Sequence, residues 1–290
     1  MRLVTYQDAR GAHIGALRDE SVVVALDSLA STMLALIEGG PDVLQAAHNV
    51  VARATTAQPL SEVQLLAPIP RPRQNIICLG MNYVEHAYES MRAKGLPPSL
   101  PPHPVFFTKA ATAVCAPEDD VPLDPHVTAA LDYEVELAFV IGQGGKNIAR
   151  ETAMRHVFGY TILNDISARD LQNRHQQFYK AKSLDRCCPM GPWIVTADEI
   201  PDPTILGLRL RLNGEPRQNS TVADLIFDIP TIIEVLSRGQ TLESGTIIST
   251  GTPSGVGMGF TPPQYMQPGD VMEAEIDRIG VLRNRVVAAE

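Results

Sequence analysis

Residues 131–141 read LDYEVELAFVI and are followed by Gly142, and this stretch indicates a β-strand. Side chains two positions apart on a strand point to the same face, so Glu134 and Glu136 are expected side by side, with the apolar residues between them on the other face. A strand this apolar is expected to be covered on both faces. Two adjacent carboxylates there need a counter-charge.

A third carboxylate, Asp165, follows the apolar run at residues 158–163 and is expected to join the pair. Three hard oxygen ligands without a nearby Cys or His favour Mg²⁺ or Mn²⁺, with Ca²⁺ as a substitute. A Glu-x-Glu dipeptide is also common on the wet face of an antiparallel strand, and taken alone it favours that ordinary interpretation.

The composition is that of an ordinary globular protein of 290 residues, long enough for one large domain and a small one. The net charge is −9, and no basic stripe stands out, so we expect no nucleic-acid partner. No stretch is apolar enough for a signal peptide or a membrane span, which predicts a cytoplasmic protein without a membrane partner. The four cysteines lack zinc-like spacing and are expected to be buried thiols.

The elements predict an α+β, β-rich fold. Strands over 2–6, 13–18 and 21–26 and helices near 31–37 and 42–53 form a small amino-terminal α+β domain, 1–68. The larger domain, 69–290, consists mainly of strands, with a hairpin at Asn213-Gly214 and a helix over 230–237 that Asp228 opens.

His86 and Glu89 lie three apart on a helix expected over 83–94, and therefore on one face. A carboxylate beside an imidazole orients it and raises its basicity, which makes a competent general base. By itself His-x-x-Glu is a weak signal, and an exposed histidine with an incidental glutamate is the simpler interpretation. The proline-rich stretch 97–104 is expected to form an extended cover.

Arg169 and Gln172 are also three apart, and an arginine fork with an amide donor suits a substrate carboxylate. Lys182 and Lys109 are further cationic candidates. For all of these residues, a solvated surface position is the ordinary alternative.

The segment Gly251–Gly257 is rich in glycine but lacks the lysine of a phosphate-binding loop and the context of a dinucleotide site. We expect a tight loop that presents backbone N–H groups and the Thr252 hydroxyl to an oxyanion.

Taken in order, these segments resemble the fumarylacetoacetate hydrolase family over residues 70 to 287. The matching stretches are Asn82-Tyr83…His86…Glu89, Phe106-Phe107-x-Lys109, Asp132-Tyr133-Glu134-x-Glu136-Leu137, Asn164-Asp165-x-Ser167-Ala168-Arg169-Asp170-x-Gln172, Lys182-Ser183-x-Asp185-x-x-Cys188-Pro189, and Ser249-Thr250-Gly251-Thr252-Pro253-Ser254-Gly255-Val256-Gly257. Departures are small, with Ala110 where members often have Pro and Phe178-Tyr179 where many have Gln-Trp.

The resemblance implies a catalytic domain of mixed, rolled β-sheets with few helices, in a homodimer that binds Mg²⁺ or Mn²⁺. It implies these site residues: Glu134, Glu136 and Asp165 as metal ligands; His86 and Glu89 as the water-activating pair on a lid; Lys182 and Thr252 at the reacting end; and Arg169, Gln172 and Lys109 near the substrate.

We therefore expect a hydrolase that cleaves a carbon–carbon bond in a small anionic 2,4-dioxo acid, such as an acylpyruvate, to pyruvate and a carboxylic acid. The same machinery serves decarboxylation of oxaloacetate-like acids, isomerisation of unsaturated 2-oxo dioic acids of the 2-hydroxyhepta-2,4-diene-1,7-dioate type, or lyase chemistry on ureidoglycolate-like substrates. The complete His86–Glu89 pair favours hydrolysis, because water needs a base. A silent, metal-stabilised binding protein is the alternative from another class, and the complete set of chemical groups argues against it.

Overall fold

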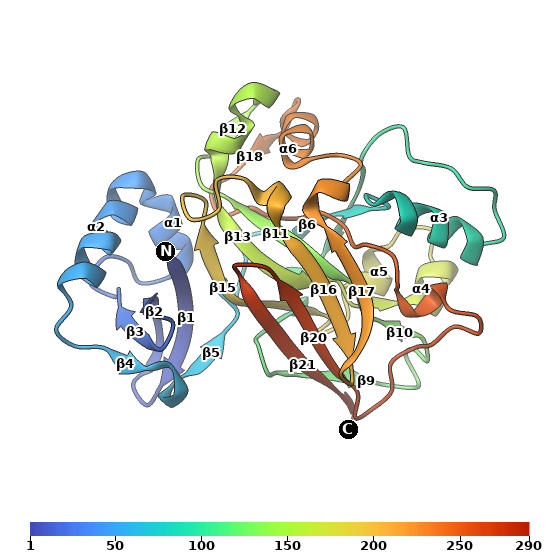
Figure 1. Cartoon of the computed structure of the whole chain (residues 1–290), viewed down its shortest axis with the longest axis horizontal. Coiled ribbons are helices and arrows are strands. Elements are labelled where there is room, and N and C mark those ends of the chain that lie inside the picture. Colours follow the sequence, from blue (N-terminus) through green and yellow to red (C-terminus); the bar gives the residue numbers. More distant parts are fainter. Residues whose placement is uncertain (290) are drawn as a thin grey trace.

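The computed structural model describes residues 1–289 and is β-rich with few helices (Figure 1). Its largest sheet has twelve strands, ten of them in the spatial order β4-β3-β2-β1-β15-β13-β11-β19-β6-β7, while β5 pairs with β1 and β8 with β15. In chain order its strands are β1 (Arg2–Asp8), β2 (Gly11–Arg18), β3 (Val22–Ala25), β4 (Gln58–Pro59), β5 (Gln64–Leu66), β6 (Ile76–Gly80), β7 (Val105–Lys109), β8 (Val114–Cys115), β11 (Val135–Ile141), β13 (Val157–Asn164), β15 (Cys188–Thr196) and β19 (Ile247–Ser249).

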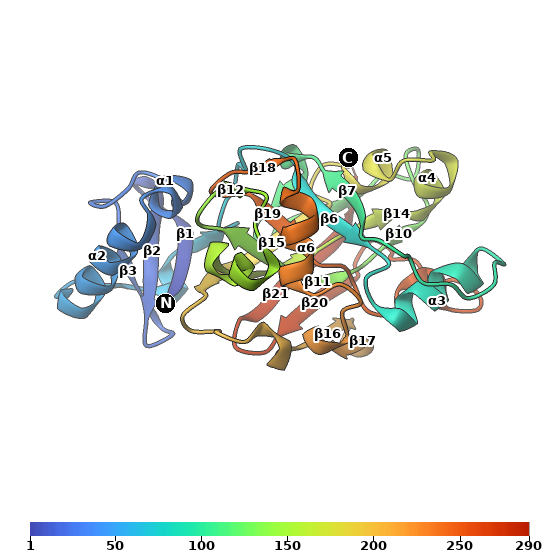
Figure 2. The same ribbon diagram turned by 90° about the horizontal axis from the view of Figure 1, so that it is seen from above.

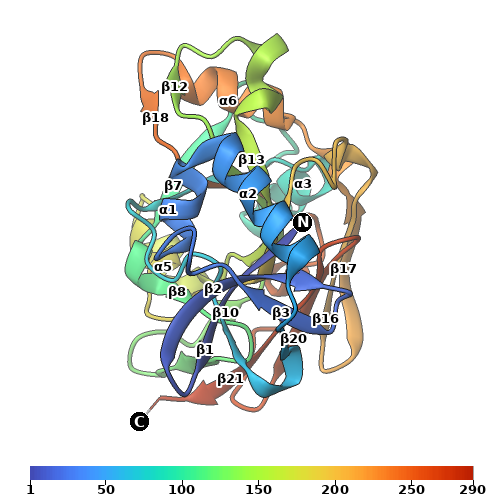
Figure 3. The ribbon, with the colours of Figure 1, turned by 90° about the vertical axis from the view of Figure 1, so that its left-hand side faces the viewer.

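The amino-terminal residues form the α+β unit expected from the sequence, with helices α1 (Met33–Glu38) and α2 (Gly40–Arg53) beside strands β1 to β3 (Figure 3). The Thr32 side chain caps α1 by accepting a hydrogen bond from the Ala35 N–H at 3.1 Å. Strand β1 pairs with β15, so one sheet continues from this unit into the rest of the chain. The domain boundary near residue 68 stays a prediction.

A second sheet of five strands packs against the large one and encloses the main core (Figure 1). Its order is β17 (Glu215–Thr221), β16 (Gly207–Leu212), β20 (Val271–Ile276), β21 (Gly280–Ala288) and β9 (Asp120–Leu123). Asn213 and Gly214 join β16 to β17 with positive φ angles of 54° and 79°, which confirms the hairpin. Alternate residues Leu208 and Leu210 of β16 point into the core that β11 also lines.

The stretch 131–141 is not one continuous strand, which corrects the sequence prediction. Residues Leu131–Asp132 form β10, which pairs with β14 (Ser167–Ala168), and β11 begins only at Val135. Between β10 and β11, side chains accept the backbone N–H groups in place of a neighbouring strand. Asn164 Oδ1 accepts the Glu134 N–H at 2.9 Å, and Asp132 Oδ1 accepts the Tyr133 N–H at 3.0 Å. Every residue of β11 is buried, as predicted for a strand covered on both faces.

Three of the remaining helices lie at the end of the molecule that also carries β10 and β14 (Figure 2). These are α3 (Val84–Ala93), α4 (Arg169–Arg174) and α5 (Tyr179–Lys182), and residues 95–104 after α3 contain no helix or strand. Helix α6 (Ile229–Ser237) begins directly after Asp228, as predicted, and a small sheet of β12 (Gly145–Lys146) and β18 (Thr241–Leu242) lies beside it.

Two further sequence predictions concern membranes and thiols. Among residues 1–289, no helix combines the length and apolar character needed to cross a membrane. All four cysteines are free and buried, as expected.

Candidate active site

Glu134, Glu136 and Asp165 converge in the interior. Glu136 lies on β11, Glu134 immediately precedes that strand, and Asp165 immediately follows its partner β13. One carboxylate oxygen from each lies within 4.8 Å of the others, and all three side chains are buried. The alternative of a wet strand face is therefore wrong.

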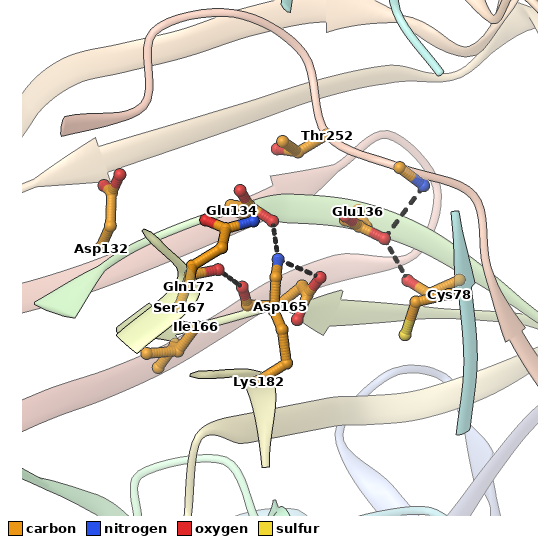
Figure 4. A network of polar contacts seen from close by, with 12 residues as sticks. Cys78, Asp132, Glu134, Glu136, Asp165, Ile166, Ser167, Gln172, Lys182 and Thr252 are labelled. Carbon is orange, nitrogen blue, oxygen red and sulfur yellow. Dashed lines mark hydrogen bonds and ion pairs between the residues drawn. The ribbon is translucent and has the colours of Figure 1, made fainter. Parts of the chain in front are cut away.

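Lysine and arginine side chains surround these carboxylates. Lys182 Nζ lies 2.6 Å from both Glu134 Oε2 and Asp165 Oδ2, between the two side chains (Figure 4). Lys109 Nζ lies 2.7 Å from Asp165 Oδ1 and donates to the Ile166 carbonyl at 3.0 Å. Both lysines are buried, so the surface alternative is wrong for them.

Arg169 is buried as well and is already bound on three sides. Its Nε donates to Asp132 Oδ2 at 2.8 Å, Nη2 to Glu134 Oε1 at 2.6 Å, and Nη1 to Gln172 Oε1 at 3.0 Å. The guanidinium therefore holds protein carboxylates, while the Gln172 side chain brings its amide to the pocket described below. Contact of either residue with a substrate carboxylate stays a prediction.

The charges in this cluster do not cancel. The buried carboxylates are Asp132, Glu134, Glu136 and Asp165, and the buried cations are Lys109, Lys182 and Arg169. Burial alone would raise the pKa of Glu134, but Lys182 and Arg169 outweigh it and hold that pKa well below its usual range. For Glu136, burial and then the charges of Asp165 and Glu134 raise the pKa well above its usual range. Glu136 is thus the carboxyl without a counter-charge, and it favours a bound proton unless a further cation is present.

Glu136 accepts hydrogen bonds at Oε2 from the Ser249 hydroxyl and from the Gly251 N–H, the latter at 3.0 Å. Within residues 1–289 it forms no ion pair. Asp165 Oδ1 receives no hydrogen bond of good geometry although Lys109 lies close to it. Uncompensated charge, an orphaned carboxylate oxygen and an all-oxygen donor set fit a hard divalent cation.

A pocket of about 430 Å³ opens onto this cluster. Its lining includes His86, Glu89, Arg169, Gln172, Lys182 and Thr252 together with Glu134 and Glu136. Lys109 does not line the pocket. The structure therefore brings most of the predicted site residues to one cavity, while Asp165 contacts the lining residue Lys182, and Lys109 in turn contacts Asp165.

His86 and Glu89 form the pair predicted from their spacing on α3. Nδ1 of His86 lies 3.1 Å from Glu89 Oε2, and both side chains are buried. Glu89 Oε1 accepts the Gly255 N–H at 3.0 Å, which fixes the carboxylate against the loop. If Nδ1 carries the proton, the lone pair on Nε2 is the basic atom. An exposed, incidental pair is excluded.

The loop Gly251–Gly257 differs from its prediction. The N–H groups of Gly251, Gly255 and Gly257 donate to Glu136, Glu89 and Asp132, so these three are not free for an oxyanion. The Thr252 hydroxyl donates to the Val135 carbonyl at 2.9 Å and accepts from Gln218 Nε2 at 2.8 Å. The loop positions carboxylates instead, and a direct role for Thr252 stays a prediction.

Sequence reasoning assigned no role to Asp132, Ser249 or Gln218, although two of them lie inside the quoted motifs. Each is buried and holds another site group by a hydrogen bond. These roles become visible only from the hydrogen-bond partners in the folded structure. A single polar residue in a strand or loop gives no sequence pattern that identifies a contact with a distant segment.

Known proteins resemble this chain along most of its length. It is 53% identical over 227 residues to oxaloacetate tautomerase YisK of Bacillus subtilis (strain 168), covering 78% of this chain and 74% of that protein. It is 40% identical over 296 residues to the mitochondrial oxaloacetate tautomerase fahd2 of Xenopus laevis, covering 99% and 90%.

A solved structure shares the fold. Maleylpyruvate hydrolase from Sphingobium sp. SYK-6, in complex with manganese(II) and pyruvate, superposes with a TM-score of 0.81 at 31% identity, with both chains fully covered. The model of the fumarylacetoacetate (FAA) hydrolase C-terminal domain matches residues 75–287. The chain belongs to the fumarylacetoacetate hydrolase family.

Proposed function

We propose that this enzyme interconverts the keto and enol forms of a small 2-oxo dioic acid, with oxaloacetate as the first candidate. The observation that carries the proposal is the 40% identity across 99% of the chain with a relative named oxaloacetate tautomerase, in a chain whose pocket holds a complete acid–base pair. Hydrolysis, the class we expected from the sequence, is named for structural neighbours at 31% and 38% identity, below the 53% identity to oxaloacetate tautomerase YisK. The isomerase alternative is therefore better supported.

Glu134, Glu136 and Asp165 are the residues that would hold Mg²⁺ or Mn²⁺. The manganese in the neighbouring hydrolase supports such an ion without identifying it for this chain. When bound, the ion would supply Lewis-acid polarisation of the 2-oxo group and its carboxylate. All other steps fall to side chains of the pocket.

His86 Nε2 takes a proton from carbon 3 of the substrate, and the electron pair of that C–H bond forms the carbon–carbon double bond of the enol. Glu89 holds Nδ1–H of the ring and stabilises its positive charge. The carbonyl electrons move to the 2-oxo oxygen, where the Gln172 amide and the one Lys182 N–H not donated to Glu134 or Asp165 can donate hydrogen bonds. A proton from solvent completes the enol, His86 releases its proton to solvent, and the reverse sequence ketonises the enol.

Positive side chains at the rim of the pocket favour a substrate with a second carboxylate. Arg92 and Lys94, at the end of α3, line the pocket, and neither side chain forms an ion pair or hydrogen bond within residues 1–289. Arg169 and Lys182 are occupied by carboxylates of the protein. The free cations therefore lie at the mouth, where the second carboxylate of a substrate would enter.

The test follows three signals from the same enzyme, first stripped of metal and then with Mn²⁺ restored. Decay of enol oxaloacetate is followed by its ultraviolet absorbance, decarboxylation by pyruvate and CO₂ release, and hydrolysis by pyruvate release from acylpyruvates. The proposal predicts metal-dependent enol decay that is faster than either release. If acylpyruvate cleavage is faster than enol decay, hydrolysis replaces tautomerisation as the proposed function. In that reaction His86 would take its proton from water.

Homodimerisation and a cytoplasmic location remain part of the proposal. Some relatives are named mitochondrial, so cell fractionation is needed to test the location of this protein. Light scattering tests whether it forms a dimer.

A further inference from the structure

Asp132 is fully buried beside the active site without belonging to the proposed metal ligands. Its carboxylate accepts four hydrogen bonds. Oδ2 accepts from Arg169 Nε at 2.8 Å and the Met258 N–H at 3.1 Å, and Oδ1 accepts from the Gly257 N–H at 2.7 Å and the Tyr133 N–H at 3.0 Å. Four donors on a single buried side chain fix it and its partners together.

One set of contacts leads to the proposed metal ligands. The guanidinium that Asp132 holds through Nε donates from Nη2 to Glu134 Oε1 at 2.6 Å. In Figure 4, Asp132 lies beyond Glu134 and away from Glu136, so it acts on the ligand from outside the cluster. Asp132 therefore orients Glu134 through Arg169, as outer-shell groups orient metal ligands.

The other set leads to the general base. Gly257 and Met258 begin the short 3₁₀ turn Gly257–Gly259, and Met258 and Gly259 line the pocket. A Cβ at Gly259 would come within 2.1 Å of Glu89 Oε1, and one at Gly257 within 2.7 Å of Asp132 Oδ1. The turn is thus packed tightly between Asp132 on one side and Glu89 on the other.

We propose that Asp132 is a positioning residue that fixes the Gly257–Gly259 turn and Glu134 relative to each other. It thereby sets the spacing between the metal ligands and the His86–Glu89 pair. Only a carboxylate meets this demand, because every group facing it is a donor. An asparagine of the same shape brings an NH₂ group against one of those donors.

The test compares Asp132→Asn with Asp119→Asn. Asp119 also accepts a backbone N–H, that of Ala116 at 2.9 Å, in a turn outside the pocket. For Asp132→Asn we expect Mn²⁺ affinity, measured by calorimetry without substrate, and kcat each to fall about 10- to 100-fold. Amide hydrogen exchange in residues 255–260 should also accelerate. Asp119→Asn should leave all three within about twofold.

A folded Asp132→Asn protein with unchanged Mn²⁺ affinity and unchanged exchange in 255–260 would overturn the proposal. Because these two readouts need no substrate, they stay valid if the tautomerase assignment fails. If Asp132→Asn does not fold, Arg169→Lys carries the test, since lysine keeps the charge but cannot donate to Asp132 and Glu134 in the same geometry. Wild-type Mn²⁺ affinity in that variant would equally refute the role.

Discussion

At the scale of single residues, Lys182 has two opposing effects. Its ammonium lies 2.6 Å from oxygens of two proposed metal ligands, where it neutralises them and competes for the lone pairs that a cation needs. Asp165 and Glu134 outweigh the effect of burial and raise its pKa, so it stays charged. The position suits a group that stabilises an oxyanion beside the carboxylates.

We predict that Lys182→Met binds Mn²⁺ more tightly, by roughly tenfold, and loses most of its turnover, because a neighbouring positive charge is removed. Calorimetry and the enol-decay assay measure the two effects separately. Lys180→Met, an exposed lysine on the same helix, is the matched control and should change neither. Weaker Mn²⁺ binding by Lys182→Met would mean that the lysine supports the ion.

Among the secondary-structure elements, helix α6 begins after Asp228, whose side chain caps its amino-terminal end. Asp228 accepts the Thr231 N–H at 3.0 Å as N-cap and binds both terminal nitrogens of Arg150 at 2.6 Å. These hydrogen bonds, with that from Arg150 the largest cause, lower the pKa of Asp228 to about 2.

Asp228→Ala should destabilise the protein by about 1 kcal/mol at neutral pH, whereas Asp228→Asn keeps the cap and should cost less. A lowered pKa in the folded state means that the ionised carboxylate stabilises the fold above the unfolded pKa of about 4. This contribution is lost as the pH falls towards 2. Thermal unfolding of both variants at pH 7 and pH 3 checks this. An equal loss for Asp228→Ala at both values would contradict it.

At the scale of the whole molecule, the sequence predicts what short-range physics dictates. The two-residue spacing brings Glu134 and Glu136 together although β11 begins only at Val135, Asn213-Gly214 determines the hairpin, and helical spacing joins His86 to Glu89. These patterns act over a few residues, so they can be predicted without knowing the tertiary structure.

Contacts between distant segments escape such patterns. Asp132 meets Arg169 across 37 positions, and the loop N–H groups turn out to bind carboxylates. The pairing of β1 with β15 depends on which edge strand of the sheet has unpaired backbone groups, and this is known only once the rest of the sheet has formed. Residue patterns also do not separate hydrolysis from tautomerisation, because both proposed reactions would use the same base and the same carboxylates.

In the proposed reaction, His86 moves a proton on a substrate held at the carboxylate cluster. The most direct measurement is the rate of enol oxaloacetate decay for His86→Gln, with Mn²⁺ affinity determined on the same sample and Glu85→Gln, exposed on the same helix, as control. We predict Mn²⁺ binding within about threefold of wild type and a rate lower by on the order of 10²–10⁴. A metal-loaded His86→Gln enzyme that turns over at the wild-type rate would rule out proton transfer by His86.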